Sequence, residues 1–186
     1  SPFFAIAEAK FYIDNAGTWD NRTGAVTITD SQNNLWGFAK FSDQLIGASL
    51  QRDHPIEHAG GAGNAAEVAN MPHCKFIIAL KNRLFAINTA AQPKLGYWCA
   101  INDRTTWDTT NDFLNFKGAE SDDEPISGVA EHLDNAILAK ESSIYRAYHT
   151  GTTPPFKYYR ISAKDGLLGH FTMQSIPACG IYPARL

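Results

Sequence analysis

The chain is poor in several features that define common protein classes. It has three cysteines in 186 residues, Cys74, Cys99 and Cys179, and none of their spacings is that of a metal knuckle. We expect buried free thiols, with one disulfide pair as the alternative. No apolar run approaches the roughly 18 residues that a membrane-spanning helix needs. The net charge of −3 gives no basic face for a nucleic acid.

Short catalytic motifs are also missing. The glycine-rich stretch at residues 60–63 lacks the Gly-Lys-Ser/Thr that a phosphate-binding loop requires. The chain contains no Gly-x-Ser-x-Gly, no Cys/His pairing and no paired carboxylates at a telling spacing. The missing motifs do not decide whether the chain is an enzyme, because sites also assemble from distant loops. We expect no cofactor and no metal.

Two metal sites remain as alternatives to that expectation. His54 and His58 are four residues apart, with His73 downstream, and zinc uses such ligands. Pro55 disfavours a helix across the pair, so we expect solvated loop histidines. The acidic residues 122–124 offer oxygen ligands for calcium, but a solvated turn is the preferred interpretation.

What the chain has in quantity is aromatic and β-branched residues in short runs. Aromatic residues make up 12% and hydrophobic residues 44%, a composition that excludes disorder. The runs are separated by Gly, Pro, Asn and Asp, which predicts an all-β fold. We expect strands at residues 3–7, 10–14 and 23–28. The capping-box spacing of Asn64 and Glu67 predicts one or two turns of helix.

One fifteen-residue stretch occurs twice, as LWGFAKFSDQLIGAS at residues 35–49 and ISGVAEHLDNAILAK at residues 126–140. Each copy predicts a hairpin that turns at Asp43 or Asp134. The run FIIALKNRLFAIN at residues 76–88 has the same shape and lies between them. The period is therefore about 40–50 residues, the length of a β-propeller blade. Identical residues occupy these pairs of positions: Gly37 and Gly128, Ala39 and Ala130, Asp43 and Asp134, Ile46 and Ile137, Ala48 and Ala139.

A second motif also recurs, an Asx residue followed after three residues by Thr-Trp. We expect the Asx side chain to cap a turn and the Trp to pack over the hairpin. The motif is loosely similar to the Asp-box hairpins of sialidases, but Ala16 and Arg104 replace the glycine of that box. The two copies are Asp14, Thr18 and Trp19, and Asn102, Thr106 and Trp107.

The units predict a propeller, or a propeller-like array of antiparallel blades. We expect this chain to be part of a larger propeller; the alternative is that its ends pair to complete one blade. The expected units are a partial blade at residues 1–20, blades near residues 21–70, 72–118 and 125–163, and a partial blade at residues 164–186.

From residue 76 onward the chain resembles β-propeller structural proteins of tailed bacteriophage virions, of the tail nozzle or tail tube type. The resemblance lies in RLFAIN (83–88), Thr-Thr-Trp-Asp (105–108) and EPISGVAEHLDNAILAKESSIYRA (124–147). It implies a structural subunit of the virion tail, assembled in the bacterial host cytoplasm. The implied partners are other virion proteins and further copies of this chain in a homo-oligomeric ring. A host-surface glycan is a further candidate ligand. No catalytic residues or nucleic-acid site come with the resemblance.

The Asp-box likeness leaves one alternative function open, a carbohydrate-binding or glycosidase-like propeller. A sialidase needs a cluster of arginines that grips a carboxylate. The seven arginines of this chain show no local grouping.

Overall fold

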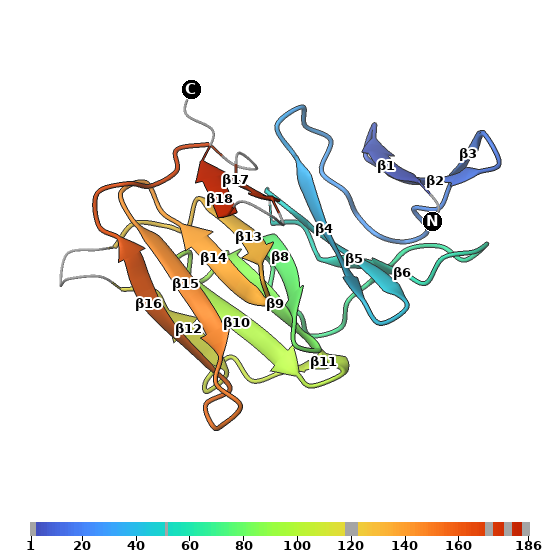
Figure 1. Cartoon of the computed structure of the whole chain (residues 1–186). Coiled ribbons are helices and arrows are strands. Elements are labelled where there is room, and N and C mark those ends of the chain that lie inside the picture. The colour runs from blue at the N-terminus through green and yellow to red at the C-terminus, as the bar shows by residue number, and fades with distance from the viewer. Residues whose placement is uncertain (1–2, 51, 118–122, 170–172, 177–179, 184–186) are drawn as a thin grey trace.

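The computed structural model describes residues 3–50, 52–117, 123–169, 173–176 and 180–183 (Figure 1). Every regular element in these ranges is a β-strand, so the predicted all-β class is confirmed. No helix in the described ranges has the length and apolar character needed to cross a membrane.

The strands form five antiparallel sheets, numbered here in chain order. Sheet 1 contains β1 (Phe4–Ala7), β2 (Lys10–Asn15) and β3 (Thr18–Asn21). Sheet 2 contains β4 (Trp36–Phe41), β5 (Gln44–Ser49), β6 (Ile56–His58) and β7 (Ala66–Glu67). Sheet 3 contains β8 (Cys74–Leu80), β9 (Arg83–Thr89), β10 (Leu95–Ala100), β11 (Asp103–Trp107) and β12 (Phe113–Asn115). Sheet 4 contains β13 (Gly128–His132), β14 (Asn135–Ala139), β15 (Ile144–His149) and β16 (Phe156–Ser162), and sheet 5 contains β17 (Met173–Ile176) and β18 (Gly180–Pro183).

Within each sheet the strands follow one another in chain order, as in a meander. In sheet 3, β10 pairs with β9 on one edge and shares its other edge between β11 and β12. The hairpins predicted from the repeat are confirmed, since β4 pairs with β5 and β13 pairs with β14. All connections inside the sheets are therefore local hairpins.

The sheets also follow one another in space. Figure 1 shows sheet 1 at the right, sheets 2 and 3 next to it, sheet 4 at the left and sheet 5 at the top. In sheets 2 to 5 the first strands of consecutive sheets contact each other: β4 contacts β8, β8 contacts β13, and β13 contacts β17. These four strands thus follow one another along the array.

Several hairpins turn through two residues that both have positive φ, which is the geometry of a type I′ turn. This turn matches the right-handed twist of the two strands that it joins. The residue pairs are Glu8 and Ala9, Ala16 and Gly17, Lys81 and Asn82, and Leu133 and Asp134. Only some of these residues are the Asn, Asp or Gly that tolerate positive φ well.

The hydrophobic core is divided into clusters between consecutive sheets. Sheets 3 and 4 enclose the largest cluster, where the Phe156 ring lies 4.6 Å from Phe85 and 5.3 Å from Trp98. Further clusters lie between sheets 1 and 2, sheets 2 and 3, and sheets 4 and 5. A sheet in the middle of the array is apolar on both faces and needs a neighbour on each side.

Two local predictions were wrong. Residues 23–28 form no strand, although Val26 and Ile28 are buried in the cluster between sheets 1 and 2. Their alternation reflects burial of an irregular segment rather than strand pairing. Residues 64–67 form no helix, because Ala66–Glu67 pairs with β6 as the edge strand β7.

Candidate functional site

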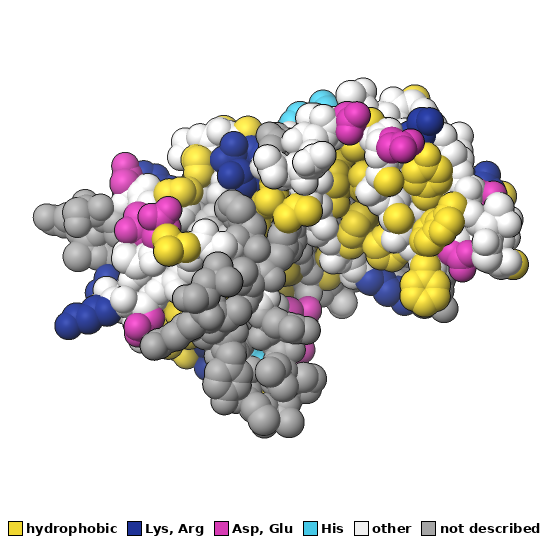
Figure 2. All heavy atoms as spheres, turned by 90° about the horizontal axis from the view of Figure 1, so that it is seen from above, with side chains coloured by type: hydrophobic (Ala, Val, Ile, Leu, Met, Phe, Trp, Pro, Cys, Tyr) yellow, Lys and Arg dark blue, Asp and Glu magenta, His cyan; other side chains and the backbone are white. Residues whose placement is uncertain are grey.

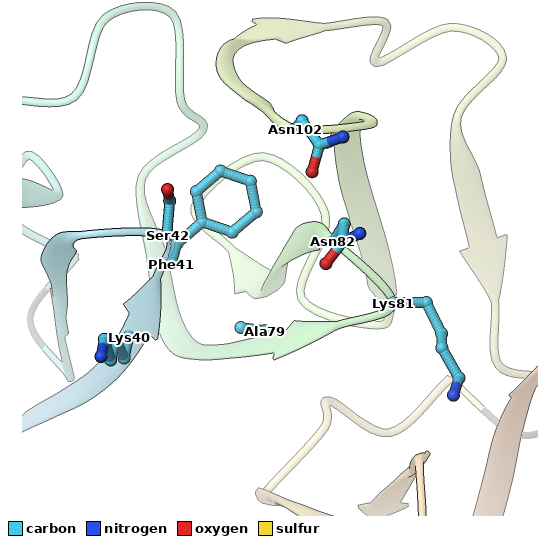
Figure 3. Close-up of a pocket in the computed structure, with 7 residues that line it drawn as sticks. All are labelled: Lys40, Phe41, Ser42, Ala79, Lys81, Asn82 and Asn102. Atoms are coloured by element: carbon cyan, nitrogen blue, oxygen red, sulfur yellow. The ribbon is translucent and has the colours of Figure 1, made fainter.

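The sequence-predicted turn residues of sheets 2 to 4 lie in turns that join antiparallel strands at one end of the array. Asp43 lies in the β4–β5 turn, Asn102 in the β10–β11 turn and Asp134 in the β13–β14 turn. A cavity of about 320 Å³ lies between the turns of sheets 2 and 3, and Figure 3 shows the residues around it. Its lining residues are Lys40, Phe41, Ser42, Ala79, Lys81, Asn82 and Asn102.

The polar groups that line this cavity are the Asn82 and Asn102 amides, the Ser42 hydroxyl and two lysines. The Asn102 backbone N–H donates to the Asn82 carbonyl at 2.8 Å, which joins the two turns of sheet 3. Lys81 points away from the other labelled side chains (Figure 3), and its Nζ donates to Asp134 Oδ2 at 2.6 Å. The lysine therefore links sheet 3 to sheet 4. Among the described residues, no carboxylate lines the cavity.

The first copy of the Asx-Thr-Trp motif caps its turn as predicted. Asp14 Oδ1 accepts a hydrogen bond from the Gly17 backbone N–H at 2.8 Å, and Thr18 begins β3. Trp19 in β3 is 51% exposed, so about half of its surface stays accessible to solvent.

The second copy is capped by the residue after the predicted one. Asp103 accepts hydrogen bonds from the Thr105 N–H and hydroxyl at 2.9 and 2.7 Å, and from the Thr106 hydroxyl at 2.7 Å. These bonds, the Thr105 hydroxyl first, lower the pKa of Asp103 to about 2. Asn102 instead supplies a positive φ of 57°. The Asp-x-Thr spacing was the signal that could have identified the cap.

Trp107 behaves differently from Trp19. Its Nε1 donates to the Arg104 carbonyl at 2.7 Å, and its ring packs against the cluster between sheets 2 and 3. This contact with a cluster between two sheets is not the packing over its own hairpin that the sequence predicts. The two copies of the motif thus differ in how exposed their indole rings are.

Arg104 joins two sheets, a role that the sequence did not suggest. It replaces the box glycine, and its guanidinium in β11 forms a bidentate pair with the Glu57 carboxylate in β6. This hydrogen bonding raises the pKa of Arg104. The pair is half-buried, so it is screened less than a surface ion pair.

Asn88 is the second inter-sheet link that sequence reasoning missed. It is 1% exposed and has a φ of 56° inside β9. Its Nδ2 donates to the Ile126 carbonyl at 2.6 Å, just before sheet 4. Its Oδ1 accepts from Arg52 Nη2 at 2.9 Å, just after β5. One buried amide therefore connects segments of sheets 2, 3 and 4.

The histidines do not form the zinc site that was considered. His58 lies in β6 and is 4% exposed; its Nδ1 accepts from the Gly60 N–H and its Nε2 bonds to the Gly63 carbonyl, each at 2.8 Å. The prediction of a solvated loop residue was therefore wrong for His58. The His54 ring lies 3.9 Å from that of His73. Among the described residues, no three His, Cys, Asp or Glu side chains gather as a ligand set.

The acidic stretch at residues 122–124 is used in local contacts where it is described. Asp123 pairs with Lys94, which lowers the pKa of Asp123. Glu124 accepts a hydrogen bond from the Ser142 hydroxyl at 2.8 Å. Asp122 lies outside the described residues. The two described carboxylates point to partners on different segments.

Two of the three cysteines are free and buried, as predicted. Burial raises the pKa of the Cys74 thiol to about 12 and also raises the pKa of Cys99. Both thiols are therefore protonated at neutral pH and weakly nucleophilic. Cys179 lies outside the described residues.

A second cavity, called here the sheet 1 groove, lies between β1 and β4. It measures about 520 Å³, and the Phe4 and Phe38 rings are 4.7 Å apart across it. Figure 2 shows hydrophobic side chains gathered on the right-hand half of this face, where Figure 1 draws sheets 1 and 2. The residues that line the groove are Phe3, Phe4, Ile13, Phe38, Ala39, Lys40, Asp43, Gln44, Leu45, His58, Ala59 and Gly60.

The chain matches no protein-family model and no curated protein sequence. The geometry of the described residues and the resemblance in residues 76–147 are therefore the two indications of function. The described polar side chains that sequence reasoning missed, Glu57, Asn88 and Arg104, all connect one sheet to another.

Proposed function

We propose that the sheets are blades of a β-propeller and that the chain is a non-enzymatic structural subunit of a tailed-phage virion, packed against neighbouring tail proteins. The observation that carries the proposal is the order of the first-strand contacts. β4, β8, β13 and β17 contact one another in sequence, and each begins its own meander. Blades of a propeller are arranged in this way around a central axis.

The use of polar side chains supports a structural role. Arg104 pairs with Glu57 between sheets 2 and 3, and Lys81 pairs with Asp134 between sheets 3 and 4. The described arginines also bind in separate places: Arg22 to Asp20, Arg52 to Asn88, Arg83 to the Cys99 carbonyl, and Arg146 to Tyr159. Such an arrangement favours a packed scaffold over a sialidase-type arginine cluster.

The main stretch that carries the phage resemblance contributes to the core of the fold. Residues 124–147 include β13, β14 and the beginning of β15. Every residue of β14 is buried, and Tyr145 is fully buried in the cluster between sheets 3 and 4. The resembling residues are therefore those that fix how one blade packs on the next.

Protein mass spectrometry of purified virions from the source of this sequence tests the proposal. We expect peptides of this chain at a fixed stoichiometry in the particle, and gold-labelled antibodies against it at the tail. Absence of the chain from particles that contain all other tail proteins contradicts the virion assignment. The intact mass of the polypeptide in the same particles reports whether these residues belong to a longer chain.

A second candidate function, glycan binding, is favoured by Trp19. Its indole is 51% exposed beside Asp20, whose carboxylate accepts a hydrogen bond from Asn15 at 3.0 Å. An exposed aromatic face next to fixed polar groups is a surface on which a sugar ring can stack. A glycan array compares the protein with its Trp19→Ala variant. Binding lost in the variant supports this candidate, and an array with no binding contradicts it.

A further inference from the structure

Arg52, just after β5, has a backbone conformation that an arginine rarely adopts. Its φ is 58°, in the left-handed region that favours glycine and asparagine. Its backbone N–H donates to the Ser49 carbonyl at 2.9 Å, and its own carbonyl accepts from Nδ1 of His73 at 3.1 Å. A glycine would form the same turn with less strain. An arginine kept in this conformation points to a use of its side chain.

The guanidinium of Arg52 contacts neutral groups. Its Nε donates to the Asn88 carbonyl at 3.4 Å and its Nη2 to Asn88 Oδ1 at 2.9 Å, so neither bond compensates the positive charge. In the part of the chain that the structure describes, no carboxylate forms an ion pair with Arg52. Two other cations that connect sheets do have a carboxylate partner, in the pairs Arg104–Glu57 and Lys81–Asp134.

Lys75 in β8 is a second cation at the same junction of sheets 2 and 3. It is half-buried, and it too forms no ion pair with a described carboxylate. Burial, and then the charge of Arg52, lower the pKa of Lys75. Two half-buried cations therefore lie close enough for their charges to repel each other.

The carboxylates that contact the segment around Arg52 are engaged elsewhere. Asp53 accepts hydrogen bonds from the Thr29 N–H and hydroxyl and from the Asn34 amide. Glu67 lies beside His54, with 3.6 Å between its Oε2 and the ring Nδ1. Neither carboxylate neutralises the two cations.

The histidines of this junction do not change the sign of its charge. The His54 and His73 rings are 3.9 Å apart, and such a pair can serve as metal ligands. The charges of Arg52 and Lys75 repel a metal cation at this place and attract an anion. The ligand that fits the junction is therefore negatively charged.

We propose that Arg52 and Lys75 bind a phosphate group at the junction of sheets 2 and 3. Such a group carries about −1.5 to −2 charges at neutral pH, which matches two cations better than a single carboxylate does. The guanidinium and the ammonium both donate charge-assisted hydrogen bonds to phosphate oxygens. The bound phosphate takes the place that Glu57 and Asp134 have in the other two links. This inference does not depend on the virion assignment.

Nuclear magnetic resonance titration of the isotopically labelled chain with inorganic phosphate, at constant ionic strength, tests the site. We expect saturable shifts that are confined to the junction. The backbone amides expected to shift are those of residues 52–54, 73–75 and 88. The absence of saturable shifts, or shifts centred on another part of the chain, overturns the proposal.

Matched lysine variants separate the site from the net charge of the protein. Lys75→Gln should weaken phosphate binding about tenfold, and Lys75→Arg, which keeps the charge, should retain it. Lys81→Gln is the control, because it removes the same charge from a lysine that pairs with Asp134. Unchanged binding in Lys75→Gln, or equal weakening in Lys81→Gln, contradicts the proposal. The spectrum of each variant without phosphate reports whether it is folded.

Two further ligands define which anion the junction recognises. Phenyl phosphate presents the same group as an ester: binding of both phosphates assigns the site to the group in either form, and binding of inorganic phosphate alone assigns it to the free ion. Acetate carries a single charge, and we expect it to bind more weakly than phosphate. Equal affinity for acetate contradicts recognition of a phosphate group.

Discussion

Sheets 1 and 3 contain the same tripeptide in two different environments. In sheet 3, Phe85, Ala86 and Ile87 are each at most 1% exposed. In sheet 1, none of the residues of β1 is buried, and Phe4 is 37% exposed. The local sequence is the same, so the difference comes from neighbours: sheet 3 has a sheet on each face and a strand on each edge of β9. Burial in this fold is a property of position in the array.

The largest loss of stability is expected from a substitution in sheet 3, in the middle of the array. Phe85→Ala removes a ring that packs against Trp98 and Phe156, and we expect the free energy of unfolding to fall by about 3–5 kcal/mol. Phe4→Ala changes the same residue type in the same tripeptide, and we expect a loss of less than about 1 kcal/mol. Urea denaturation of both variants measures the contrast. Equal losses would show that the neighbours of sheet 3 do not create the difference.

The second-largest loss of stability is expected at Asn88, the buried residue that connects sheets 2, 3 and 4. Asn88→Ala removes the bonds to the Ile126 carbonyl and to Arg52, and leaves both partners without this amide. We expect a loss of about 2–3 kcal/mol. Asn88→Gly is the control, because glycine accepts the φ of 56° but also lacks the amide. Similar losses in both variants assign the effect to the hydrogen bonds, whereas a harmless Asn88→Gly assigns it to the backbone.

A gain in stability is expected at the β13–β14 turn. Leu133 holds a φ of 46° and is 71% exposed, so its side chain gains little from packing and adds strain. Leu133→Asn should raise the free energy of unfolding by about 1 kcal/mol, since Asn adopts this conformation readily. Thermal denaturation compares it with Leu133→Val, which is expected to destabilise because β-branched residues tolerate positive φ poorly.

The smallest effect is a pH dependence in the β10–β11 turn. The pKa of Asp103 is lowered from 3.8 to about 2 by hydrogen bonds from Thr105 and Thr106. Because the folded pKa lies below the unfolded one, this stabilisation is present above about pH 4 and is lost as the pH falls toward 2. Asp103→Asn should lower the melting temperature at neutral pH, and the difference from the unmodified protein should shrink below pH 4. A difference that is constant with pH contradicts this account.

The sequence predicts the strands better than their surroundings. The repeat located the β4–β5 and β13–β14 hairpins because turn residues and apolar runs are local signals. It placed the cap of the β10–β11 turn on Asn102 rather than Asp103, since both are Asx residues at adjacent positions. It could not find the Arg104–Glu57 pair, whose partners come from different sheets. The contact of Trp107 with the cluster between sheets 2 and 3 likewise depends on residues far away in the sequence.

Hydrogen–deuterium exchange of β1 and β9 tests most directly the claim that neighbouring strands and sheets, rather than the local sequence, decide burial and protection. The account predicts that the amides of β9 are strongly protected because β8 and β10 cover its two edges. It predicts that the amides of β1 exchange faster, because among the described residues β1 pairs with β2 alone. Equal protection of the two strands would contradict this claim.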